Sequence, residues 1–84
     1  MFGLKPKPLA LTIRQLGFEA VLSTNNPEGS CVIRSLEGHH HDVFITKGKR
    51  GDFKIRLYDT LIGQTVLMTS AKSLKDVKNT LNQL

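Results

Sequence analysis

A hairpin signal in the middle of the chain constrains the fold more than any other feature. Residues 53–58 (Phe-Lys-Ile-Arg-Leu-Tyr) alternate in the way that is typical of a β-strand with one buried face. Residues 43–46 before them are also rich in β-forming side chains, and a glycine-flanked turn separates the two segments. If residues 49–51 form a three-residue loop with Gly51 in the left-handed region, Ile45 lies opposite Ile55. The chain is therefore predicted to contain an antiparallel sheet.

Further strands and two helices complete the predicted fold. We expect additional strands at residues 18–23, 31–36 and 65–69, separated by turns at residues 25–29 and 37–38. A short helix is expected over residues 9–16, after an extended lead-in at residues 1–8, with Gly17 as its C-terminal cap. A second helix should begin after Ser73 and carry an apolar stripe formed by Leu74, Val77, Leu81 and Leu84. The predicted class is α+β: a short N-terminal helix, a four- to five-stranded antiparallel sheet and a C-terminal helix, with both helices packed on one face of the sheet.

Length and composition limit the chain to a simple organisation. Its 84 residues are enough for one domain, and no repeat or linker divides them, so residues 1–84 are expected to form a single domain. The single cysteine, Cys31, excludes an internal disulfide and is expected to be a small buried or half-buried side chain. No apolar run reaches the length of a membrane span, and residues 1–8 lack the apolar core of a secretory signal. We therefore expect a cytoplasmic protein with no membrane partner.

The expected strand registers predict which face of the sheet is left for binding. If Glu37-Gly38 forms a two-residue turn, Val32 lies opposite Val43, and the two hairpins agree on one core face. That core face would carry Val32, Val43, Ile45, Phe53, Ile55 and Leu57. The opposite face would carry Cys31, Ile33, His40, Phe44, Thr46, Lys54, Arg56 and Tyr58. Exposed rings beside cations are typical of an interaction surface.

The charge distribution favours an anionic partner. The chain has 12 Lys+Arg against 7 Asp+Glu, a net charge of +5, and residues 47–56 hold five Lys or Arg and one Asp. Such cations can neutralise phosphates, and Phe44 and Tyr58 could stack on unpaired bases. We therefore expect a small basic, non-enzymatic binding protein that contacts nucleic acid or a nucleic-acid-handling complex. The residues expected to make the contact are Phe44, Lys47, Lys49, Arg50, Lys54, Arg56, Tyr58, Lys72 and Lys75.

Other interpretations of the same surface stay open. The basic hairpin could be a solvated turn whose charges only aid solubility, or it could meet an acidic protein. The protein could also be an interaction module, such as an inhibitor, an adaptor or a homodimer. Such a module would use the apolar part of the outer face (Ile33, Phe44 and Tyr58) or an open sheet edge.

One short segment resembles a known family. The tail Ser70-Ala-Lys-Ser-Leu-Lys75, which opens the last predicted helix, is similar to the start of the second helix of double-stranded RNA-binding domains. The resemblance implies that Lys72 and Lys75 would contact phosphates across a groove. The chain departs from the family at Ala71, where a lysine would stand, in its helix packing positions and in having at least four strands instead of three.

The sequence offers no catalytic or metal-binding constellation. In a strand, His39 and His41 point to one face and His40 to the other, so with Cys31 they do not close a four-ligand zinc shell. The carboxylates are scattered, the glycines match no phosphate-binding loop, and nothing orients a histidine as a base for Cys31. We therefore expect no enzyme activity, no cofactor, no metal and no small-molecule substrate. A metal shared between two copies through the histidines is the remaining alternative.

Overall fold

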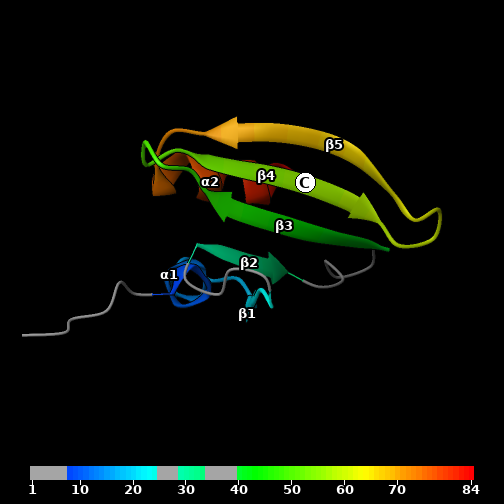
Figure 1. Ribbon diagram of the computed structural model, residues 1–84, viewed down its shortest axis with the longest axis horizontal. Coiled ribbons are helices and arrows are strands. Elements are labelled where there is room, and N and C mark those ends of the chain that lie inside the picture. Colours follow the sequence, from blue (N-terminus) through cyan, green and yellow to red (C-terminus); the bar gives the residue numbers. More distant parts are fainter. Residues whose placement is uncertain (1–7, 25–28, 34–39) are drawn as a thin grey trace, which may run out of the picture.

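The chain forms a five-stranded antiparallel sheet with a helix at each end of the sequence (Figure 1). The computed structural model describes residues 8–24, 29–33 and 40–84. Neighbouring strands follow one another in sequence order, β1-β2-β3-β4-β5, and every pair is antiparallel. The elements are α1 (Leu9–Gln15), β1 (Val21–Leu22), β2 (Ser30–Ile33), β3 (His41–Lys47), β4 (Phe53–Asp59), β5 (Gln64–Ala71) and α2 (Leu74–Gln83). The predicted α+β class is confirmed, with five strands.

Both helices begin and end where local chemistry predicts. Pro8 precedes α1, and Gly17 follows its C-cap residue Leu16 with a φ of 103°, a left-handed value that glycine adopts without strain. The Gly17 N–H donates to the Arg14 carbonyl over 3.0 Å. At the start of α2, the Ser73 Oγ accepts a hydrogen bond from the Asp76 N–H at 3.3 Å, so Ser73 satisfies one of the free amide groups of the first turn.

The β3–β4 hairpin has the predicted register. Val43 lies opposite Leu57 and Ile45 opposite Ile55. The Gly48 N–H donates to the Asp52 carbonyl at the end of the ladder, and Gly51 has a φ of 83°. The loop of residues 49–51 therefore closes with its glycine in the left-handed region, as the turn chemistry requires.

The predicted register of β2 is wrong by one residue. Ile33, and not Val32, lies opposite Val43, while Val32 lies opposite Phe44. Cys31 and Ile33 consequently belong to the core face, and Val32 belongs to the opposite face. The error has a physical reason: residues 31–33 are all apolar, so either register buries an apolar side chain and hydrophobicity does not choose between them. The predicted turn at residues 37–38 lies outside the described residues, as do residues 25–28 of the other turn and residues 1–7 of the lead-in.

A single apolar cluster joins the two helices to one face of the sheet. It contains Leu9, Ala10 and Ile13 from α1, Val77 and Leu81 from α2, and the inward side chains of the strands, which are Cys31, Ile33, Val43, Ile45, Phe53, Ile55 and Ala71. The helix α1 contacts β1 and β2, whereas α2 contacts β5. We call the sheet face that carries this cluster the core face, and the opposite one the outer face.

The outermost strands differ from the prediction in length. The first, β1, has only two residues where six were expected, although Phe18 and Ala20 before it still pack on the core. The last, β5, has eight residues and extends beyond the predicted span of 65–69 at both ends. A register shift opposite Leu57 and Tyr58 leaves Val66 as an extra, bulged residue. None of the described helices combines the length and the apolarity that crossing a bilayer demands.

Candidate functional site

The outer face of the sheet is hollowed across all five strands. The hollow has a volume of about 470 Å³, and we call it the outer hollow. Its lining includes Leu22 from β1, Ser30 and Val32 from β2, Phe44 and Thr46 from β3, Lys54 and Arg56 from β4, and Met68 from β5. Apolar side chains and cations therefore share one concave surface on the side of the sheet away from the helices.

Aromatic rings and a guanidinium group form a compact cluster on this face. Phe44 and Arg56 lie opposite each other on β3 and β4, and the Arg56 Cζ sits 4.7 Å from the centroid of the Phe44 ring. The Tyr58 ring meets Phe44 edge-on, with centroids 6.0 Å apart and an interplanar angle of 89°. Such a cation–π contact contributes about 0.5–1 kcal/mol at an exposed site.

This cluster changes the role expected for Phe44. Because Arg56 covers one face of its ring, Phe44 supports the guanidinium and does not offer that face to a base. The exposed planar group at this position is Arg56 itself, and a guanidinium plane also stacks on bases. Any stacking on this face therefore falls to Arg56 and to the half-buried Tyr58 ring.

The remaining predicted cations gather at one end of the sheet. Lys49 and Arg50 are exposed in the β3–β4 turn. Lys47 is the last residue of β3 and lies opposite Phe53, so its register places it on the core face. Ala71 also lies opposite Phe53, so exposed Lys72 follows at this same end, and Lys75 belongs to the first turn of α2. Figure 1 shows the β3–β4 turn and the β5–α2 connection meeting there. Of the predicted cations, only Lys54 and Arg56 line the outer hollow. The other five lie at this end of the sheet outside the hollow, with Lys47 and Lys75 on the helix side, and Asp52 and Asp76 lie at the same end.

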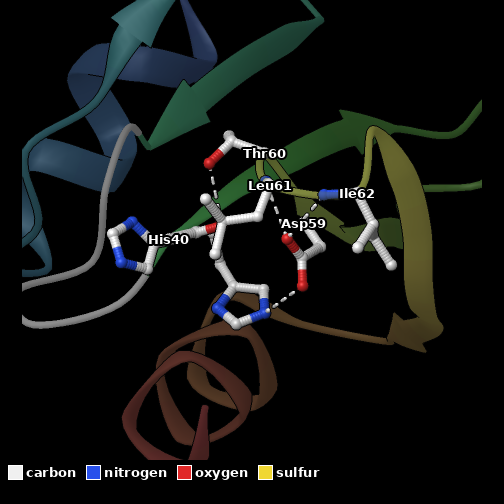
Figure 2. A network of polar contacts seen from close by, with 6 residues as sticks. His40, Asp59, Thr60, Leu61 and Ile62 are labelled. Atoms are coloured by element: carbon white, nitrogen blue, oxygen red, sulfur yellow. Dashed lines mark hydrogen bonds and ion pairs between the residues drawn. The ribbon is translucent and has the colours of Figure 1, made fainter.

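At the opposite end of the outer face, the described residues include an acidic side chain. Asp42 lies opposite Tyr58 there, and neighbouring residues of the β4–β5 turn form a polar network (Figure 2). The Asp59 Oδ1 accepts hydrogen bonds from the Leu61 N–H at 2.8 Å and the Ile62 N–H at 3.3 Å, and its Oδ2 lies 3.5 Å from the His41 Nε2. Among the described residues of the outer face, the cations therefore lie toward the β3–β4 turn and Asp42 lies at the far end, whereas His41 and Asp59 have the core-face register.

The backbone of His40, the residue before β3, holds this turn in place. The His40 carbonyl accepts hydrogen bonds from the Thr60 N–H at 2.9 Å and from the Thr60 Oγ1 at 3.0 Å (Figure 2). His39 lies outside the described residues. Within the described ranges, no three His, Cys, Asp or Glu side chains come together as metal ligands.

Cys31 lies in the core and not on the outer face. Its residue surface is only 1% exposed, and burial raises the pKa of its thiol to about 11. The thiol is consequently protonated at neutral pH, which is unfavourable for a nucleophile or a metal ligand. The expected buried or half-buried apolar role of Cys31 is confirmed.

Three apolar residues of the outer hollow were missed by sequence reasoning. Val32 was assigned to the core by the register error, and Leu22 was not assigned to a face. Met68 lies opposite Arg56. Regular alternation counted along the whole of β5 does not place it there, because the bulge at Val66 exchanges the two faces for the residues that follow.

Comparisons with protein families, with curated proteins and with solved structures find no match for this chain.

Proposed function

We propose that this protein is a small, non-enzymatic binding protein that holds single-stranded nucleic acid against the outer face of its sheet. The observation that carries the proposal is the outer hollow, which combines Arg56 stacked on Phe44 and the Lys54 ammonium group in a concavity of about 470 Å³, with the Tyr58 ring edge-on against Phe44 beside it. Planar groups beside cations are the combination that single-strand binders use, because each nucleotide offers a base to stack and a phosphate to neutralise.

The geometry favours unpaired bases over a duplex. Arg56 and Tyr58 can stack only on bases whose faces are accessible, and the bases of a duplex are stacked on one another. The described cations nearest the hollow are Lys54 and Arg56 within it and Lys49 and Arg50 in the adjoining β3–β4 turn. A strand would therefore cross the half of the hollow nearest the turn, with its phosphates toward Lys54, Lys49 and Arg50.

We also propose a cytoplasmic location. The only cysteine is the buried Cys31, so the fold requires no oxidising compartment for disulfide formation.

A salt-dependent titration with two matched variants tests the function. Binding of fluorescein-labelled single-stranded RNA and DNA oligonucleotides would be followed by fluorescence anisotropy over a series of salt concentrations. If Lys49, Arg50 and Lys54 each neutralise one phosphate, log K should fall with log salt with a slope of about −2.1 for a single strand. Lys54→Gln should reduce this slope by about 0.7, because it removes one phosphate contact.

Lys78→Gln is the control for this experiment. Lys78 is exposed on α2, so the substitution removes the same charge from the helix side of the molecule, away from the outer hollow. Equal weakening by Lys54→Gln and Lys78→Gln would mean that net charge alone drives binding. That result, or the absence of binding at about 50 mM salt, would contradict a site on the outer face.

A further inference from the structure

Two rows of side chains cross the outer face of the sheet from strand to strand. In the first row, Ser30 lies opposite Thr46, Thr46 lies opposite Lys54, and Lys54 lies opposite Ser70. We call these residues the hydroxyl row, because all of them except the lysine carry a hydroxyl group. Thr46, Lys54 and Ser70 are exposed and Ser30 is half-buried, so the row presents polar groups to a ligand on this face.

The second row lies further from the β3–β4 turn and has a different chemistry. It consists of side chains that lie opposite one another on β2, β3, β4 and β5, namely Val32, Phe44, Arg56 and Met68. We call it the planar row, because its centre is the Arg56 guanidinium stacked on the Phe44 ring. Residues two positions apart on a strand are separated by about 7 Å, so the two rows run side by side at that distance.

The chemistry of the outer face changes in the same order as the parts of a nucleotide. The exposed cations Lys49 and Arg50 of the β3–β4 turn come first, the hydroxyl row follows, and the planar row comes after it. A nucleotide joins its phosphate, its sugar and its base in this order. When the phosphates meet the turn cations and Lys54, and a base stacks on Arg56, the sugar between them lies over the hydroxyl row.

We infer that the outer face selects RNA over DNA, and that Thr46 contacts the ribose 2′-hydroxyl. The inference rests on the proposed function and adds the class of nucleic acid that the site takes. A threonine hydroxyl both donates and accepts hydrogen bonds, and so does the 2′-hydroxyl, which deoxyribose lacks. Thr46 is the residue in position for this contact because it is exposed, lines the outer hollow and lies opposite Lys54, which meets the phosphate of the same nucleotide.

A pair of fluorescein-labelled decamers, oligouridine and oligodeoxyuridine, tests this inference. They carry the same base and differ only in the 2′-hydroxyl group. Fluorescence anisotropy of the full chain at about 50 mM salt should give the RNA decamer a Kd about 2- to 10-fold below that of the DNA decamer, which is the gain from one net hydrogen bond.

Thr46→Val separates the hydroxyl group from the shape of the side chain. Valine keeps the branched form and suits a strand, but it can neither donate nor accept a hydrogen bond. The variant should bind the RNA decamer as weakly as the DNA decamer and should leave the affinity for DNA unchanged. Thr65→Val is the matched control, because Thr65 is exposed on the outer face opposite Tyr58, beyond the planar row, and its loss should preserve the preference for RNA.

The possible outcomes distinguish this inference from the proposed function. Equal affinity of the wild type for the two decamers would overturn the inference and leave the proposed function intact. Equal weakening of both decamers by Thr46→Val would also overturn it, because the hydroxyl group would then contact a phosphate, and so would loss of the RNA preference in Thr65→Val. Absence of binding to either decamer would contradict the proposed function and the inference together. The wild-type comparison requires no variant, so it decides alone if Thr46→Val fails to fold.

Discussion

The thiol of Cys31 offers a direct test of which side chains face the core. The predicted register places this residue on the outer face, where reagents would reach it, whereas the structure buries it against the helices with 1% of its surface exposed. Since Cys31 is the only cysteine in the chain, any thiol modification reports on this one position. Alkylation with iodoacetamide, with the native and the guanidinium-unfolded protein compared, therefore separates the two arrangements.

The structure sets the size of the expected effect. Burial raises the pKa of the thiol from an ordinary value of 9.0 to about 11, so at pH 8 the fraction of thiolate falls from about one-tenth to about one-thousandth. Because the thiolate is the reactive form, this change alone slows native alkylation about 100-fold, and exclusion of the reagent slows it further. The native rate should also keep rising as the pH increases from 8 to 10, whereas the unfolded protein approaches its plateau.

Two results would refute this account. A native rate within tenfold of the unfolded rate at pH 8, or a native pH profile that levels off near pH 9, would place the thiol in contact with water. Mass spectrometry after a timed quench measures both quantities.

The same pKa makes a contribution to stability that depends on pH. The folded-state pKa lies above the ordinary value, so the folded protein retains the thiol proton more tightly than the unfolded chain does. This contribution is fully present below about pH 9 and is lost as the pH rises toward 11. The stability advantage of the wild type over Cys31→Ala should therefore shrink over this interval, as measured by urea unfolding of both proteins at a series of pH values.

Two further predictions concern the turns. Gly51→Ala should lower the free energy of unfolding by about 1 kcal/mol in urea titrations, because a φ of 83° strains any residue with a Cβ although no atom lies within 4 Å of that position. An unchanged stability would show that the loop adopts another conformation. Asp59→Ala should cost about 1–2 kcal/mol and speed amide exchange at Leu61 and Ile62, since both lose their acceptor. Asp59→Asn keeps an acceptor oxygen and should leave the two amides protected; equal exchange in the two variants would mean that the carboxylate oxygen does not hold this turn.

Local sequence chemistry was sufficient for the parts of the fold whose geometry is settled within a few residues. Gly51 determined the loop of the β3–β4 hairpin and hence its register, and Gly17 ended α1. Ser73 began α2, and the spacing after it correctly placed Val77 and Leu81 in the core and Leu84 against it, whereas Leu74 of the predicted stripe is 37% exposed. For the same reason the sequence placed Phe44, Lys54, Arg56 and Tyr58 on one face, since all four lie on the two strands of that hairpin.

The register of β2 and the alternation along β5 required the tertiary structure. Residues 31–33 are apolar on both sides of the strand, so the sequence contains no hydrophobic contrast that could assign Cys31 and Ile33 to the core and Val32 to the outer hollow. The bulge at Val66 reverses the faces of the residues that follow it, and this shift depends on pairing with β4 and not on the residues of β5 alone. The sequence by itself determined a basic α+β chain whose central hairpin carries aromatic rings and cations on one face. Long-range strand pairing decided which apolar residues line the outer hollow beside those groups and which strand forms the edge of the sheet.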